Sequence, residues 1–127
     1  MTHWARQYLG QPWVSGESDC YALVRRVYRE VLGVELPLVD VTQAEPVRLR
    51  RLMEAESITW DAVQYPRELD VVMMSHGARP HHVGLWTDAD GGRVVHSLER
   101  TGVVAPSLLG LTMGGWRVLG FYRRVTQ

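Results

Sequence analysis

The only cysteine of the chain, Cys20, lies in the first turn of the strongest predicted helix, which runs from Ser18 to Gly33. The first turn of a helix presents unpaired backbone N–H groups and about half a positive charge. Both favour a thiolate over a thiol, so we expect a lowered pKa for Cys20 and a reactive sulfur. The same N–H groups can stabilise the oxyanion that forms when sulfur attacks a carbonyl group. The alternative is that Cys20 is only a small apolar residue on a buried helix face.

A nucleophilic cysteine needs a base, and the composition leaves histidine as the candidate. The chain contains no lysine and no asparagine, which excludes a Schiff-base lysine, a Ser–Lys dyad and a Cys–His–Asn triad. We interpret His82 as the base and His96 as the residue that orients its ring. His81 is a second candidate for the base, whereas His3 and His76 are assigned structural positions.

The hairpin between the strands of the two histidines decides whether their rings meet. With a five-residue loop over residues 88–92, Thr87 faces Arg93, and His96 lies diagonally from His82 on the same face. With a two-residue Asp-Gly turn, the register shifts by one and His96 points to the other face. The sequence leaves both registers open.

A zinc site is a weaker alternative for part of this set. Imidazole is a common zinc ligand, and His76, His82 and His96 supply three of them. Their spacings match no familiar zinc motif, and a zinc site leaves Cys20 without a role. We therefore expect neither a metal nor any other cofactor.

The first half of the chain is predicted to be helical. The helix around Cys20 has apolar residues at helical spacing, Ser18 or Asp19 as its capping residue and a terminating Gly33. A short helix is expected over residues 4–9, and a second long one over residues 43–56, opened by a capping box. The positions expected on the buried face of the first long helix are Cys20, Leu23, Val24, Val27, Tyr28, Val31 and Leu32.

The second half is predicted to form strands, because β-branched residues and glycines increase after residue 58. The expected strands span residues 70–74, 82–86, 93–98, 102–105 and 117–123. Helices followed by antiparallel strands indicate an α+β fold, with N-terminal helices packed on an antiparallel sheet of about five strands. No repeat or linker interrupts the pattern, so we expect a single domain over residues 1–127.

Composition excludes several classes of protein. The 127 residues include 14 basic and 14 acidic side chains, so the net charge is zero. This balance argues against nucleic-acid binding and against electrostatic attachment to an anionic membrane. The longest apolar run, Cys20 to Val24, is too short for a membrane span, and no signal peptide is expected. A single cysteine permits no internal disulfide.

Four short motifs carry a resemblance to a known family. They are Asp19-Cys20 opening a helix, Asp70-Val71-Val72-Met73-Met74, His82-Val83-Gly84-Leu85-Trp86 and Val94-Val95-His96. In this order and at this spacing they resemble the NlpC/P60 cysteine peptidases. Two further segments are similar to the short phage-encoded branch of that family, found in phage tails and gene-transfer-agent particles. These segments are Gly10-Gln11-Pro12-Trp13 and Val31-Leu32-Gly33-Val34-Glu35-Leu36-Pro37.

The resemblance implies a papain-like fold and hydrolysis of peptide bonds in the stem peptides of bacterial peptidoglycan. Carried over by position, Cys20 is the nucleophile, His82 the general base and His96 the orienting residue. The backbone N–H of Cys20 is then part of the oxyanion hole.

The resemblance also implies a set of substrate-site residues, in which this chain departs from the family pattern. Asp19 helps to shape the site. Tyr21 replaces a small residue after the cysteine, and Trp13 replaces a tyrosine that lines the site, with Tyr8 as a substitute for its hydroxyl. Leu69 replaces the glycine that precedes the first strand motif. These departures concern the substrate more than the thiol chemistry.

A second hypothesis is an assembly module, a phage tail component that keeps the fold without turnover in solution. Its partners are other phage tail proteins, whereas those of the hydrolase are peptidoglycan stem peptides. Under either hypothesis we expect synthesis in the bacterial cytoplasm and, for the phage type, incorporation into a tail or virion-like particle.

Overall fold

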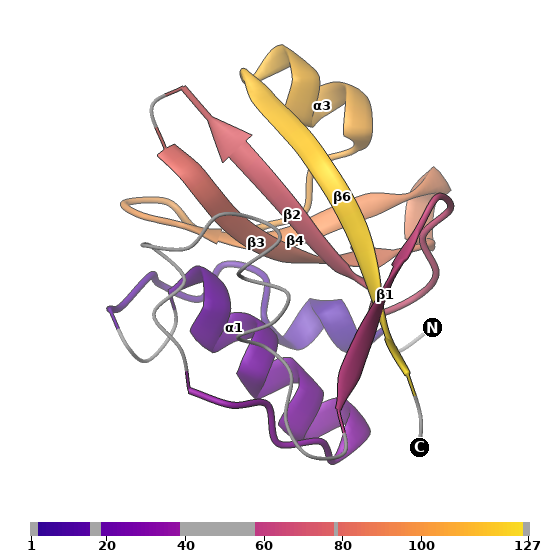
Figure 1. The fold of residues 1–127 in the computed structure, drawn as a ribbon. Helices are drawn as coiled ribbons and strands as arrows, with labels where there is room; N and C mark the ends of the chain where they lie inside the picture. Colours follow the sequence, from indigo (N-terminus) through magenta and orange to yellow (C-terminus); the bar gives the residue numbers. More distant parts are fainter. Residues whose placement is uncertain (1–2, 16–18, 39–57, 78, 126–127) are drawn as a thin grey trace.

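The computed structural model describes residues 3–15, 19–38, 58–77 and 79–125 (Figure 1). The helical segments are η1 (Trp4–Gln7), α1 (Cys20–Val27), η2 (Tyr28–Leu32), η4 (Ala89–Gly91) and α3 (Leu108–Met113). The strands are β1 (Thr59–Val63), β2 (Val71–His76), β3 (Arg79–Thr87), β4 (Arg93–Leu98), β5 (Gly102–Val104) and β6 (Trp116–Val125). The helix predicted over residues 43–56 lies outside the described residues.

An antiparallel sheet of six strands in the order β1-β6-β2-β3-β4-β5 is the centre of the fold. The α+β class is confirmed, and the five predicted strands correspond to β2 through β6. The expected number of about five is wrong by one, because β1 was not predicted. Asp61 and Ala62 are exposed at successive positions of β1, so the strand lacks the alternation that marks a half-buried strand. Its pairing with β6 holds it in the sheet.

Helix α1 begins where the sequence predicts, because Asp19 caps it. The carboxylate of Asp19 accepts a hydrogen bond of 2.9 Å from the N–H of Ala22, and its carbonyl accepts one from Leu23. Val24 and Val27 are fully buried in the cluster that joins α1 to β3 and β4. The helix thus crosses one face of the sheet and packs on these two strands (Figure 1).

The end of this helix corrects one expectation. After Val27 the chain continues as the π-helical turn η2 and ends at Gly33, whose φ of 68° gives the predicted left-handed stop. A π-turn adds a residue to the turn, which rotates the following side chains away from the α-helical stripe. Val31 and Leu32 were expected to be buried, but they are 36% and 40% exposed.

The sheet carries a separate apolar cluster on each face. The first cluster joins α1 to inward residues such as Val83 and Val95. The second contains Trp86, Val94 and Leu111 of α3, which lies on the opposite side of the sheet from α1 (Figure 1). Successive residues of β3 and β4 therefore alternate between the two clusters.

Helix α3 was not predicted from the sequence. It spans only six residues, is capped by the Ser107 side chain, and buries Leu111 alone, so it shows no readable helical period.

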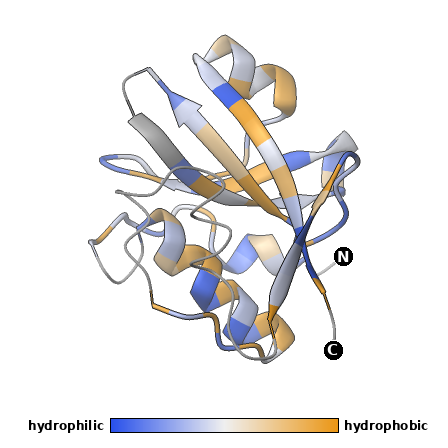
Figure 2. Ribbon diagram, in the orientation of Figure 1, coloured by the Kyte–Doolittle hydropathy of each residue, from blue (hydrophilic) through white to orange (hydrophobic). Residues whose placement is uncertain are grey.

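Hydrophobic residues colour much of α3, whereas hydrophilic segments interrupt α1 (Figure 2). No helix in the described ranges is long and apolar enough to cross a membrane.

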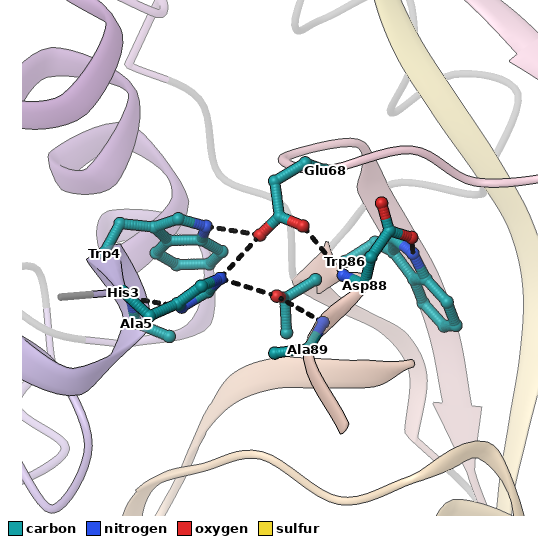
Figure 3. A network of polar contacts seen from close by, with 8 residues as sticks. His3, Trp4, Ala5, Glu68, Trp86, Asp88 and Ala89 are labelled. Carbon is teal, nitrogen blue, oxygen red and sulfur yellow. Dashed lines mark hydrogen bonds and ion pairs between the residues drawn. The ribbon is translucent and has the colours of Figure 1, made fainter. Parts of the chain in front are cut away.

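Glu68 ties the N-terminal segment to the sheet (Figure 3). Its carboxylate accepts hydrogen bonds from the indole of Trp4 at 2.7 Å and from the backbone N–H of Asp88 at 2.7 Å. The His3 ring lies 2.9 Å from the same carboxylate and 2.9 Å from the Thr87 hydroxyl. The network joins η1 to the loop that follows β3, and it is built from segments far apart in the sequence.

Candidate active site

The hairpin between β3 and β4 brings His82 and His96 together. Thr87 pairs with Arg93, which is the register of the five-residue loop, and this alternative is confirmed. Nε2 of His82 lies 2.9 Å from Nδ1 of His96. The rings meet edge to face, with centroids 5.0 Å apart. The two histidines are thus a hydrogen-bonded pair on one face of the sheet.

Gly84 is the residue that lets the pair form. A Cβ at this position would lie 2.9 Å from Cβ of His96 and 2.8 Å from the carbonyl oxygen of Val95. These separations are too short for a Cβ atom to fit. Only glycine at position 84 therefore allows β3 to approach β4 this closely beside His96. The glycine of the His-Val-Gly motif therefore has a steric role in the site.

His96 is a buried, neutral imidazole. The residue is 1% exposed, and burial lowers its pKa from 6.5 to about 4. A neutral imidazole has one acceptor nitrogen and one donor nitrogen. When Nδ1 of His96 accepts the Nε2–H of His82, the other ring nitrogen of His82 is left with its lone pair. In this tautomer the pair equips His82 to take a proton.

Cys20 approaches the strand of His82 at Val83, the next residue, and is a thiol at rest, which corrects the expectation of a lowered pKa. Its sulfur accepts hydrogen bonds from the backbone N–H of Val83, the residue after His82, and from the N–H groups of Tyr21 and Cys20 itself. Burial outweighs these bonds and raises the pKa of the Cys20 thiol from 9.0 to about 11. The negative charge of Asp19 acts in the same direction as burial.

The Cys20 sulfur meets β3 beyond the part of the strand that pairs regularly with β4. Regular pairing of β3 with β4 runs from Thr87↔Arg93 to Leu85↔Val95. Val83 lies two residues beyond the last of these pairs, at the place where the thiol contacts its N–H. The sulfur therefore lies one residue along the strand from His82, while the two N–H groups of the first helical turn face it.

The residues expected to line a substrate site lie in different environments. Asp19 is half-buried and caps α1. Trp13 is half-buried in the segment between η1 and α1. Tyr21 is 4% exposed and donates its hydroxyl to the carbonyl of Pro37 at 2.7 Å. Tyr8 is fully buried.

The Tyr8 hydroxyl is used within the protein. It donates to the Glu30 carboxylate at 2.7 Å, and the Arg26 guanidinium lies 5.5 Å from the centroid of the Tyr8 ring. Arg26 also forms the i,i+4 ion pair with Glu30. Tyr8 thus joins η1 to the polar side of the helix that carries Cys20.

Trp116 is a site residue that sequence reasoning missed. Its ring centroid lies 4.7 Å from that of His82 and 5.3 Å from that of His96. The available signal was a bulky aromatic residue directly after Gly114-Gly115, just before the last predicted strand over residues 117–123. Glycines before a strand permit close approach of a neighbouring group, and here that group is a histidine.

The described side chains offer no cluster of three or more histidine, cysteine, aspartate or glutamate residues that could hold a metal ion. His76, the third histidine of the zinc alternative, is exposed and lies against Trp116 with ring centroids 4.8 Å apart. The indole of Trp116 thus contacts the rings of both His76 and His82.

No curated protein matches the chain. A family model described as the NlpC/P60 family matches residues 7–117, a span that includes Cys20, His82 and His96. The match extends over most of the chain, which therefore belongs to the NlpC/P60 family.

Proposed function

We propose that this chain is a cysteine peptidase that cleaves peptide bonds in the stem peptides of bacterial peptidoglycan. The NlpC/P60 family acts on peptidoglycan and suggests a cell-wall hydrolase. The observation that carries the finer proposal is the His82–His96 hydrogen bond, with the Cys20 sulfur at the N–H of the next residue of the same strand. In this proposal Cys20 is the nucleophile, His82 the base and His96 the orienting residue.

The proposed reaction begins with the resting thiol. The Cys20 proton passes to His82, and the sulfur attacks the carbonyl carbon of the scissile peptide bond. The oxyanion that forms is stabilised by the N–H of Cys20 in the first turn of α1. The C–N bond then breaks as His82 returns the proton to the leaving amine. Water, deprotonated by His82, hydrolyses the thioester, which releases a carboxylic acid and restores the thiol.

In this proposal His96 orients His82, and its burial and its hydrogen bond to His82 support that role. Because His96 stays neutral well below neutral pH, its Nδ1 can accept the Nε2–H of His82 whether His82 is neutral or protonated. The bond fixes the tautomer of His82 and holds its ring while the proton moves. A buried cation at position 96 would instead repel the imidazolium formed on His82.

The test is the release of peptide fragments from purified peptidoglycan, followed by mass spectrometry. We expect the wild type to add one water to a stem peptide bond, producing a new amine and a new carboxyl group. Cys20→Ser and His82→Gln should lower the rate by at least about a thousandfold. Met113→Ala, at an exposed position of α3, is the matched control and should retain the rate. Equal rates for the wild type and Cys20→Ser contradict the proposal.

The phage type is a finer part of the proposal. We propose a papain-like, tail-associated hydrolase, made in the bacterial cytoplasm and built into a phage tail beside other tail proteins. Support comes from the segment around Gln11, which resembles the phage branch and is held against β5. Gly10 donates to the carbonyl of Val103, and Val103 donates to the carbonyl of Gln11. Detection of the chain in purified particles tests this part.

One observation favours a second candidate, an assembly module with little hydrolase activity. Burial keeps the Cys20 thiol protonated at rest, as in a structural cysteine. This candidate predicts that Cys20→Ala particles assemble and infect as the wild type does. A loss of infection with normal assembly favours the hydrolase.

A further inference from the structure

Trp116 occupies a defined place beside the histidine pair. It opens β6 and is the register partner of His76 on β2. Its ring is half-buried against the second apolar cluster, on the face of the sheet that carries His82 and His96. The indole lies at a 45° tilt to His82 and edge to face with His96, at an interplanar angle of 82°. One side chain therefore packs on both members of the pair.

These contacts have two physical consequences for His82. A large rigid ring at a centroid distance of 4.7 Å restricts rotation of the imidazole, so Nε2 keeps its direction toward His96. The electron-rich face of an indole also attracts a cation, and the proposed reaction creates a cation on the His82 ring. Any large apolar side chain at position 116 could restrict the His82 ring by packing on it. Attraction of the protonated ring, in contrast, requires an aromatic side chain.

The surrounding backbone fixes Trp116 in turn. Gly115 has a φ of 84°, a left-handed conformation that glycine adopts without strain. Nε2 of His76 lies 2.9 Å from the carbonyl oxygen of Gly114, and the His76 ring packs on the indole at 4.8 Å. The pairing of β2 with β6 also shifts register between Met73 and Met74, as it approaches this end of the strand. The direction of the indole is thus set by three features: the turn at Gly115, the His76 ring and the register shift between β2 and β6.

We propose that Trp116 is a positioning residue for His82, which holds the imidazole in line with His96 and stabilises its protonated form. This inference rests on the proposed function for its catalytic meaning, but its physical content concerns the His82 ring alone. Among the described residues, His96 from β4 is hydrogen-bonded to His82, His76 from β2 packs on the same indole, and the Cys20 sulfur lies at the N–H of Val83, the next residue of β3.

The primary test is an NMR titration of the His82 ring in the wild type, Trp116→Phe and Trp116→Leu, with the His82 resonance assigned from a His82→Gln spectrum. Loss of the aromatic face in Trp116→Leu should lower the His82 midpoint by about half a pH unit. Trp116→Phe, which keeps a smaller aromatic face, should shift it by less. Trp86→Phe is the matched control, since Trp86 is buried on the same face and packs on Phe121.

Kinetics on peptidoglycan fragments gives the second readout. Trp116→Leu should lower kcat about tenfold with little change in KM, because the indole acts on the ring and not on the substrate. An unchanged His82 midpoint in both Trp116 variants, with a stability loss like that of Trp86→Phe, overturns the proposal. If the wild type cleaves no peptidoglycan, the proposed function fails, but the NMR titration still decides the role of Trp116. If Trp116→Leu does not fold, the Phe variant alone decides it.

Discussion

The sulfur of Cys20 is subject to two opposing influences. Burial and the charge of Asp19 favour the thiol, whereas the N–H groups of Val83 and the first helical turn favour the thiolate. The balance lies on the side of the thiol, so in the proposed reaction the thiolate forms by proton transfer to His82 at the moment of attack. A protonated resting sulfur is also less prone to oxidation and alkylation.

Asp19 offers a way to separate its two effects on this sulfur. Asp19→Asn keeps a good capping residue but removes the charge, so the Cys20 pKa should fall with little change in melting temperature. We expect iodoacetamide alkylation below the midpoint to be faster by roughly threefold. Asp19→Ala should show the same reactivity change and, in addition, lose about 1 kcal/mol of stability. Slower alkylation of Asp19→Asn would show that its charge does not oppose the thiolate.

His96 makes the fold sensitive to acid. Its pKa in the folded protein, about 4, lies below the unfolded value of 6.5, so the unfolded chain binds the proton first. The stability that the protein gains from keeping His96 neutral is fully present above pH 6.5 and is lost as the pH falls toward 4. At pH about 4.5 the loss should reach about 2–3 kcal/mol.

The matched pair His96→Gln and His76→Gln tests this in denaturant titrations between neutral pH and pH 4.5. His96→Gln should lose about 2–3 kcal/mol less of its free energy of unfolding on acidification than the wild type does. Its stability at neutral pH should be lower than that of the wild type. His76→Gln, at an exposed position, should retain the acid loss of the wild type. An acid loss in His96→Gln equal to that of the wild type would assign the sensitivity to other groups.

At the scale of elements, the close approach of β3 and β4 depends on Gly84. Gly84→Ala should push His96 away from His82 and cost about 1–3 kcal/mol through overpacking. We also expect a loss of peptidoglycan cleavage by at least about tenfold, since the hydrogen bond between the rings lengthens. Gly110→Ala in α3 is the control, because its Cβ meets nothing closer than 3.3 Å. Normal cleavage by Gly84→Ala would show that the strands separate without disturbing the pair.

The sequence predicted the elements whose pattern is local and missed those that depend on partners. The start of α1 at Cys20 and the stop at Gly33 were predictable from the local sequence, whereas the π-helical turn η2 between Val27 and Gly33 was not. The register of the histidine pair was left between two alternatives, because Asp88–Gly92 contains the signals of both a short and a long loop. β1 and α3 were missed because pairing with β6 and one buried leucine stabilise them, not an internal period.

The same limit applies to the candidate site. Cys20, His82 and His96 could be chosen from residue type, order and family resemblance. The raised pKa of Cys20 could not, because helix position predicts the favourable N–H groups but not the burial that outweighs them. Trp116 lies far from the histidines in sequence, and only the pairing of β6 with β2 brings it to His82.

At the scale of the whole molecule, Glu68 connects the N-terminal segment to the loop after β3 (Figure 3). Glu68→Ala removes the acceptor for Trp4, His3 and the Asp88 N–H. We expect amide exchange at Tyr8 and Leu9, which bond to the carbonyl of Ala5, to become about tenfold faster.

The global melting temperature of Glu68→Ala should change much less than this local protection, because the apolar clusters on the two faces of the sheet are untouched. Glu35→Ala is the matched control, since the exposed Glu35 carboxylate comes no closer than 4.0 Å to the Arg25 guanidinium. Unchanged exchange at Tyr8 in Glu68→Ala would show that packing of η1, not the carboxylate, anchors the segment.

The place of β6 in the sheet has a consequence for the synthesis of the protein. β6 follows all the other strands in the chain, yet it lies between β1 and β2. During translation the thiol of Cys20 leaves the ribosome first, and the sheet is complete only after β6 inserts. A nascent or truncated chain that ends before Trp116 would carry the sulfur without the finished centre. The proposed hydrolase would therefore gain its complete centre only after the last strand of the chain has been synthesised.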